Sequence, residues 1–177
     1  MTRTILTYGL ISGLVAIAGI VASIMLAPDG HGSMLVGYLI MLVALSSILV
    51  AVKQYRDTVL GGVIRFHVAF LMGLAIAVLA TAAYVAGWEA YLAATGYRFM
   101  PEMVAETLAS KRAAGVTGAE YAKLAADMQA MARSYENPLL RWLMTSAEIF
   151  PVGLLVALVS AGLLRMPGFL PARSHPA

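Results

Sequence analysis

The chain has 177 residues, of which 61% are hydrophobic and 12% charged, and its formal net charge is +3. A soluble domain carries about 25% charged residues, so this composition excludes an ordinary soluble protein and indicates a membrane protein. The chain contains no cysteine, which excludes disulfides and thiolate chemistry. It also contains no run of basic residues, so we predict no nucleic-acid partner.

Four apolar segments are long enough to cross a bilayer, because about 20 helical residues span a hydrocarbon core of ~30 Å. None of them shows the strict alternation of a barrel strand. We therefore predict an all-α membrane protein with four transmembrane helices in a single membrane domain, residues 1–177. The spans are predicted at about residues 5–27, 34–52, 66–88 and 139–164.

The first span is predicted to be a permanent helix and not a cleaved signal peptide. Its apolar run exceeds the roughly 7–15 residues of a signal-peptide core, and no small-residue cleavage site precedes Pro28. The connection that follows, residues 28–33, contains Asp29 and His31 but no lysine or arginine. The simplest interpretation of these two side chains is ordinary loop polarity.

Lysine and arginine in short loops predict the orientation, because they are enriched on the cytoplasmic side. Basic residues precede the first span, separate the second from the third and follow the fourth: Arg3, Lys53, Arg56, Arg65, Arg165 and Arg173. We therefore predict that both termini face the cytoplasm. Lys53, Arg56 and Arg65 are expected to contact lipid headgroups.

The segment between the third and fourth spans is predicted to be an extracytoplasmic helical hairpin at about residues 100–135. Pro101 is placed at the first position of one helix, and residues 117–120 have the pattern of a capping box for the next. The second helix carries one apolar stripe: Tyr121, Leu124, Met128, Met131 and Tyr135. Either the two helices pack on each other or on the membrane surface, or the stripe binds a partner protein.

Small residues recur at every fourth position inside the spans. The first span has Gly9 and Gly13, and the others have Ala69, Gly73, Ala77, Thr81, Gly153, Ala157 and Ala161. Small residues let membrane helices approach closely, so we expect the spans to form a four-helix bundle. A homodimer face is the alternative.

The last span contains a carboxylate and a proline. Asn137 is the expected N-cap, with Pro138 at the first helical position. Pro151 removes one backbone donor inside the helix and is expected to kink it. Counted from Leu164 at ~1.5 Å per residue, Glu148 lies ~6 Å inside the outer boundary of a ~30 Å core, within reach of headgroup water.

Four polar residues on the predicted outer side are the candidate ion site: Glu148, Glu89, Asp29 and His31. An ionisable residue within a span is by default a functional hypothesis. Carboxylates and imidazole suit divalent cations, but this mixture does not select a particular metal. The alternative for Glu148 is a structural bond to a neighbouring helix or to Arg141 or Arg98. No catalytic residue is predicted, since the zinc-protease, P-loop and serine-hydrolase motifs are absent.

Three short segments, taken in their order along the chain, support a resemblance to a known family. They are YGLISG at residues 8–13, YRD at residues 55–57 and FPVG at residues 150–153. With them the chain resembles a family of small bacterial inner-membrane proteins known only as a domain of unknown function, DUF-4199. The resemblance implies four spans and a bacterial cytoplasmic membrane, and it brings no activity.

The functional prediction is a non-enzymatic accessory or scaffold subunit without a cofactor. Its expected partners are the lipid bilayer and either another membrane protein or a second copy of the chain. The first alternative is a small transporter or an ion-binding membrane protein that uses the outer carboxylates. The second is a membrane enzyme, for which the sequence offers no nucleophile–base pair.

Overall fold

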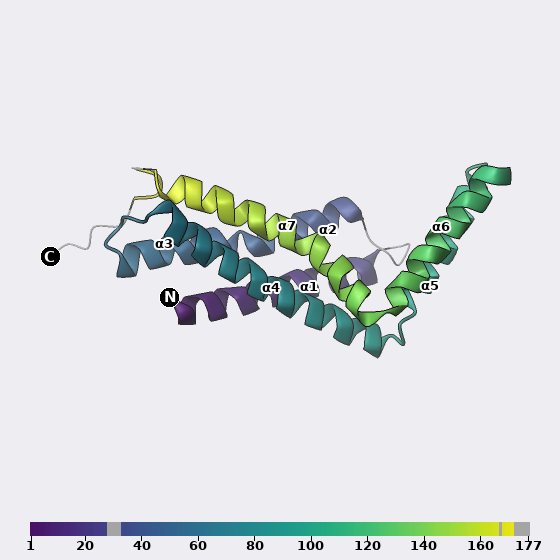
Figure 1. The fold of residues 1–177 in the computed structure, drawn as a ribbon, viewed down its shortest axis with the longest axis horizontal. Helices are drawn as coiled ribbons and strands as arrows, with labels where there is room; N and C mark the ends of the chain where they lie inside the picture. Colours follow the sequence, from purple (N-terminus) through teal and green to yellow (C-terminus); the bar gives the residue numbers. More distant parts are fainter. Residues whose placement is uncertain (28–32, 167, 172–177) are drawn as a thin grey trace. The chain divides into compact units, whose positions relative to one another are not determined.

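The structure is a computed structural model that describes residues 1–27, 33–166 and 168–171. Every regular element in these ranges is a helix, and Figure 1 shows the helices in chain order. They are α1 (Thr2–Leu26), α2 (Met34–Leu45), α3 (Ser47–Val59), α4 (Phe66–Ala94), α5 (Phe99–Ala113), α6 (Gly118–Glu136) and α7 (Pro138–Leu164).

Four stretches of helix are long and apolar enough to cross a membrane. They are Thr2–Leu26, Met34–Val59, Phe66–Ala94 and Pro138–Leu164, each 25 to 29 residues long. At ~1.5 Å per residue, even the shortest exceeds the ~30 Å hydrocarbon core. The prediction of an all-α protein with four long apolar helices is therefore confirmed.

Two helices continue further than predicted. The second span runs through α2 and α3 to Val59, beyond the predicted end at residue 52, and α4 continues past residue 88 to Ala94. Charged side chains do not end α3, because Lys53 bonds Asp57 one turn later at 2.5 Å. Such i,i+4 pairs support the helix, and a cation near its C-terminus is favourable.

The chain divides into two compact units, to which α4 and α7 both contribute. Unit 1 comprises Met1–Gly87 and Ser146–Ala177, and unit 2 comprises Trp88–Thr145. Each unit is described by itself below. A single membrane domain stays a prediction.

Unit 1 is packed through the small residues that the sequence singled out. A Cβ atom added to Gly13 of α1 would lie 2.5 Å from the carbonyl oxygen of Ala80 in α4. A Cβ atom added to Gly153 of α7 would lie 2.8 Å from the Cβ atom of Ala77, which is also in α4. The helix backbones therefore approach too closely here for a larger residue. A homodimer through these residues is untested.

Hydroxyl groups add polar contacts between the helices of unit 1. The Ser12 hydroxyl of α1 donates to the Tyr8 carbonyl and is hydrogen-bonded to the Ser47 hydroxyl at the start of α3. On the same two helices, the Tyr8 hydroxyl donates to the Gln54 side chain at 2.8 Å. Buried polar groups in an apolar interior need such partners.

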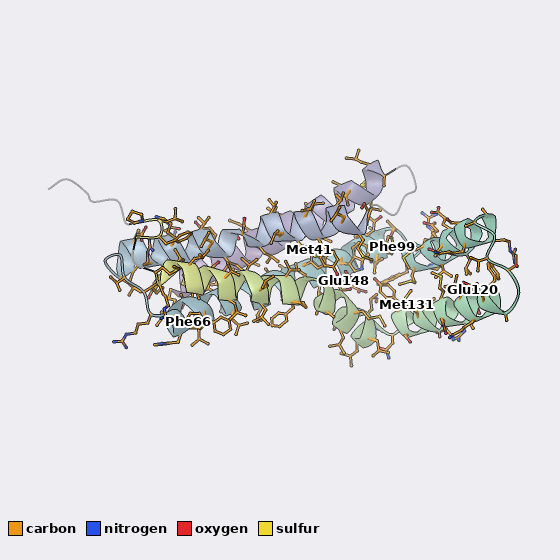
Figure 2. All side chains as sticks on the ribbon, turned by 90° about the horizontal axis from the view of Figure 1, so that it is seen from above. Met41, Phe66, Phe99, Glu120, Met131 and Glu148 are labelled. Carbon is orange, nitrogen blue, oxygen red and sulfur yellow. The ribbon has the colours of Figure 1, made fainter. Side chains whose placement is uncertain are left out.

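Unit 2 contains two consecutive helices, α5 and α6, here called the α5–α6 pair. They pack against each other (Figure 2). Arg112 of α5 lies 4.5 Å from the ring centre of Tyr121 in α6. Of the predicted apolar stripe, Tyr121, Leu124 and Met128 are half-buried, and no residue of α6 is fully buried.

Two details of the helix starts were predicted wrongly. Helix α5 begins at Phe99, so Pro101 lies within its first turn and not at its first position. A proline is tolerated there because the first backbone N–H groups have no intrahelical partner. Thr117 is the N-cap of α6, but its side chain makes no capping bond. Gly118 enters the helix with φ of +63°, which departs from the backbone geometry of a capping box.

The close approach of α1 and α4 predicts the effect of one added methyl group. Gly13→Ala should lower the free energy of unfolding by about 1–3 kcal/mol, the usual cost of overpacking. The measurement is the denaturation midpoint in mixed detergent micelles. Gly162→Ala is the matched control, because an added Cβ atom there would meet no atom of another described segment within 4 Å. Equal midpoints for the two variants would contradict the prediction.

Candidate functional site

The densest polar cluster of unit 2 surrounds the carboxylate of Glu89 in α4. Arg141 of α7 donates to it with Nε at 2.9 Å and Nη2 at 2.6 Å, which is the bidentate arrangement. The Tyr97 hydroxyl donates at 2.9 Å and the Trp142 indole N–H at 3.1 Å. Each carboxylate oxygen therefore accepts two hydrogen bonds, which uses the full acceptor capacity of the group. We call these four residues the Glu89 cluster.

Arg141 connects the cluster to the end of α6. Its Nη1 atom donates to the carbonyl of Tyr135 at 2.9 Å and, more weakly, to that of Glu136 at 3.5 Å. These carbonyls belong to the last turn of α6, where no intrahelical donor is available. The guanidinium also lies 5.0 Å from the ring centre of Tyr97, a cation–π distance. Arg141 is consequently only 5% exposed.

Trp88 fixes both ends of the α5–α6 pair. Its indole N–H donates to the Tyr135 hydroxyl near the end of α6 at 2.6 Å. Its ring meets that of Phe99, the first residue of α5, edge to face with the ring centres 5.0 Å apart. Aromatic pairs of this geometry contribute about 0.5–1.5 kcal/mol beyond their buried area. Trp88 thereby contacts the first helix of the pair at its start and the second near its end.

A left-handed turn brings Tyr97 to Glu89. Gly96 and Tyr97 have φ of +65° and +56°, and the N–H of Tyr97 donates to the carbonyl of Leu92 at 2.8 Å. Such a turn closes a helix C-terminus, but the left-handed conformation costs a residue with a side chain about 1–2 kcal/mol. The hydrogen bond to Glu89 offsets part of this cost. It also raises the pKa of the Tyr97 phenol above its ordinary value, since a nearby carboxylate disfavours phenolate.

The start of α7 places Arg141 and Trp142. The Asn137 side chain accepts hydrogen bonds from the N–H groups of Leu139 at 3.0 Å and Leu140 at 3.5 Å. Pro138 is the first residue of the helix. The predicted N-cap and first position are both confirmed. Because they fix where α7 begins, they also determine on which side of the helix Arg141 lies.

Among the candidate ion-site residues, Glu89 belongs to the Glu89 cluster, whereas Glu148 lies in unit 1. Glu148 is exposed and makes no hydrogen bond or ion pair with the described residues of that unit. Asp29 and His31 lie outside the described residues. Convergence of the four on one site is therefore untested. Within the described ranges no three histidine, aspartate or glutamate side chains gather as a metal site would require.

The sequence interpretation did not identify the partner of Glu89. Arg141 was considered as a partner for Glu148, but its carboxylate partner in unit 2 is Glu89. Arg98, the other arginine considered, donates to the Thr95 carbonyl at 3.1 Å and lies 4.0 Å from Glu102. The sequence does carry a signal, because a tryptophan adjoins each of Glu89 and Arg141, and tryptophan concentrates at membrane boundaries.

A second polar cluster forms around Arg56 in the last turn of α3, within unit 1. Arg56 donates to Asp57 at 2.7 Å, to the carbonyls of Leu164 at 3.4 Å and Phe169 at 3.1 Å, and to that of Leu170. It is only 2% exposed. Arg56 therefore satisfies the end of α7 and holds the segment that follows it. Lipid-headgroup contacts of Lys53, Arg56 and Arg65 stay a prediction, and the guanidinium of Arg56 is directed to protein atoms.

Pro151 lies inside α7, which continues as a helix on both sides of it. The proline is exposed within unit 1. Its position in the span is as predicted, while the kink stays a prediction.

These features define the class of protein. Four long apolar helices, joined by polar residues that bond within the protein, make this a multi-pass helical membrane protein. The family model of the protein of unknown function DUF4199 matches residues 7–166, and the chain belongs to that family. The comparison with curated proteins gave no match, and the comparison with solved structures gave none.

The Glu89 cluster predicts a measurable loss of stability. Glu89→Gln leaves the Arg141 guanidinium, 5% exposed, without a counter-charge, so the free energy of unfolding should fall by about 2–3 kcal/mol. The two tryptophans of the chain, Trp88 and Trp142, both belong to unit 2, so their fluorescence monitors the unfolding of this unit. Glu102→Gln is the control, because that exposed carboxylate is worth less than about 1 kcal/mol. Equal losses for the two variants would disprove the role of the cluster.

The hydrogen bonds of Arg56 predict that this one side chain holds the segment around Phe169 in place. Arg56→Gln removes the charge and most of the donors, so a cysteine introduced at Phe169 should react with a maleimide about tenfold faster. The chain has no cysteine of its own, so labelling is specific. Arg65→Gln, which changes the same charge at an exposed residue, should leave the rate unchanged. An unchanged rate in Arg56→Gln would show that other contacts hold the segment.

Proposed function

We propose that the protein is a non-enzymatic accessory or scaffold subunit of a membrane assembly, in which a four-helix bundle presents the α5–α6 pair as a docking element. The observation that supports this most directly is the double attachment of the pair to Trp88. Phe99 at its start and Tyr135 near its end both contact that one side chain. An element held at both ends is ordered before it binds, which favours docking because ordering a mobile segment on binding costs affinity.

The α5–α6 pair has apolar surface to offer. Two helices packed only on each other bury little apolar surface, and no residue of α6 is fully buried. Met131, the fourth residue of the apolar stripe, is 39% exposed (Figure 2). An incompletely covered apolar stripe is favourably covered by the apolar surface of a partner protein. We therefore place the partner on the side of α6 that carries Met131.

The proposed location is a bacterial cytoplasmic membrane, with both termini in the cytoplasm and the α5–α6 pair as an extracytoplasmic hairpin. The basic residues Arg3, Lys53, Arg65 and Arg165 support this orientation because they all flank spans on the predicted cytoplasmic side. In this arrangement Lys53 and Arg65 contact the headgroups of anionic lipids. The bacterial location follows from the resemblance described above.

The alternative, an ion-binding protein or small transporter that uses Glu148 with Glu89, Asp29 and His31, has less support. A carboxylate that accepts four hydrogen bonds has no lone pair left for a metal ion, and Glu89 accepts four. Loss of the Arg141 pair would have to precede coordination. Glu148 remains available, but one carboxylate alone makes a weak cation site.

One cysteine variant tests both the orientation and the docking surface. Met131→Cys is treated in intact cells with a membrane-impermeant maleimide that carries a photoreactive group, followed by illumination. We expect labelling without cell lysis, because the pair lies outside, and a discrete adduct heavier than the chain, because the partner covers this surface. The measurement is the mass of the labelled species on a denaturing gel.

Arg133→Cys is the matched control, because Arg133 is exposed and lies two residues, or about 200°, around α6 from Met131. It should be labelled equally well but give at least about tenfold less adduct. Labelling only after lysis would overturn the orientation. Equal adduct from both positions, or no adduct from Met131→Cys, would overturn the docking role.

A further inference from the structure

Glu148 is a charged group without a partner in its unit. It lies on α7 (Figure 2), is exposed, and makes no hydrogen bond or ion pair with the described residues of unit 1. A charged side chain inside a span is costly unless it meets water, a counter-charge or a hydrogen-bond donor. At its predicted depth Glu148 can reach headgroup water, and a counter-charge from another helix would add an interaction that the described part of unit 1 does not provide.

Pro151 deprives a second acceptor, beside this carboxylate, of its usual donor. In a helix the N–H of residue 151 would donate to the carbonyl of Ala147, and proline has no N–H. The helix continues through Pro151, so this carbonyl loses its usual donor. Ala147 is exposed, as are Glu148 and Pro151. A carboxylate and a peptide carbonyl thus lie at adjacent positions on one exposed turn.

The two faces of α7 in unit 1 differ in what they contact. Gly153 and Ala157 meet Ala77 and Gly73 of α4, so the side of α7 that carries them is covered. Leu155, which is 58% exposed, and Leu158 and Val159 are uncovered. Together with Glu148 and Pro151 they form a continuous stripe at helical spacing, here called the Glu148 face. It combines an apolar strip with a carboxylate and a carbonyl that lacks its usual donor.

We propose that the Glu148 face binds a transmembrane helix of the partner protein, and that this helix carries an arginine at the depth of Glu148. A guanidinium has five N–H donors in a planar fork, and it can bond both carboxylate oxygens and the Ala147 carbonyl. The pair is neutral, which allows both charges to remain within the span. This inference rests on the proposed role as an accessory subunit and adds the chemistry of the partner.

Charge distinguishes this partner from other occupants of the Glu148 face. A second copy of the chain, joined by two-fold symmetry at this face, would bring two carboxylates together, and like charges repel. A phospholipid carries a phosphate that repels the carboxylate, so its ammonium group is a poorer counter-charge than an arginine in an apolar helix. Complementary charge therefore favours a basic helix from another protein.

The test uses defined transmembrane peptides in place of the unidentified partner. The full-length protein, labelled with a donor fluorophore at a cysteine introduced at Met166, is placed in phosphatidylcholine vesicles. Two acceptor-labelled leucine–alanine helices are compared, one with a single arginine about four residues inside one boundary and one with leucine there. We expect the arginine peptide to associate about three- to tenfold more strongly, as hydrogen bonds between membrane helices allow.

Three variants show whether Glu148 causes the preference. Glu148→Gln, with similar shape and no charge, should bind both peptides equally. Glu148→Asp keeps the charge and should retain part of the preference, which excludes a folding defect as the cause. Glu120→Gln removes the same charge from the exposed start of α6 and should retain the full preference.

Several outcomes would overturn the inference. These are equal binding of both peptides to the wild type, and an arginine preference that survives Glu148→Gln. Loss of the preference when phosphatidylethanolamine replaces phosphatidylcholine would assign the face to a lipid. Energy transfer between labelled copies that requires Glu148 would assign it to a second copy. The photo-adduct at Met131 does not involve this face, so the inference can fail while the proposed docking role stands.

Discussion

The ion pair between Glu89 and Arg141 is the interaction on which unit 2 depends. It joins the C-terminal part of α4 to the first turns of α7, and through the Tyr135 carbonyl it also holds the end of α6. Arg141 is nearly buried, so its desolvation is offset only if every donor finds an acceptor. The carboxylate, two carbonyls and two aromatic rings around it meet that requirement. Within unit 2, these bonds consequently connect the end of α6 to the adjoining parts of α4 and α7.

The same principle applies to Arg56 in unit 1, with different acceptors. There the guanidinium meets one carboxylate and three backbone carbonyls, which include the last residue of α7. A helix ending in or near a bilayer leaves carbonyls that water does not reach, and a buried arginine supplies the missing donors. Both arginines therefore act as multi-donor connectors between segments far apart in the sequence.

Hydropathy predicted the four long helices because lipid imposes a length and an apolar composition on any span. Helices α3 and α4 extend beyond the predicted spans, which end at residues 52 and 88, and in α3 the local pair between Lys53 and Asp57 supports this extension. The N-cap at Asn137 was predictable because capping is local. The bonds from Arg141 to Glu89 and from Arg56 to the C-terminal segment were not, since these partners lie 52 and more than 100 residues apart along the chain. The left-handed conformation of Tyr97 was not predictable either, because a tyrosine rarely adopts it.

The way in which Arg56 holds the C-terminal segment has a consequence for how this part of the chain can change. Its acceptors at Phe169 and Leu170 are main-chain carbonyls, which every amino acid possesses. Exchange of the side chains at these two positions therefore leaves the acceptors in place, so the attachment demands no particular residue type there.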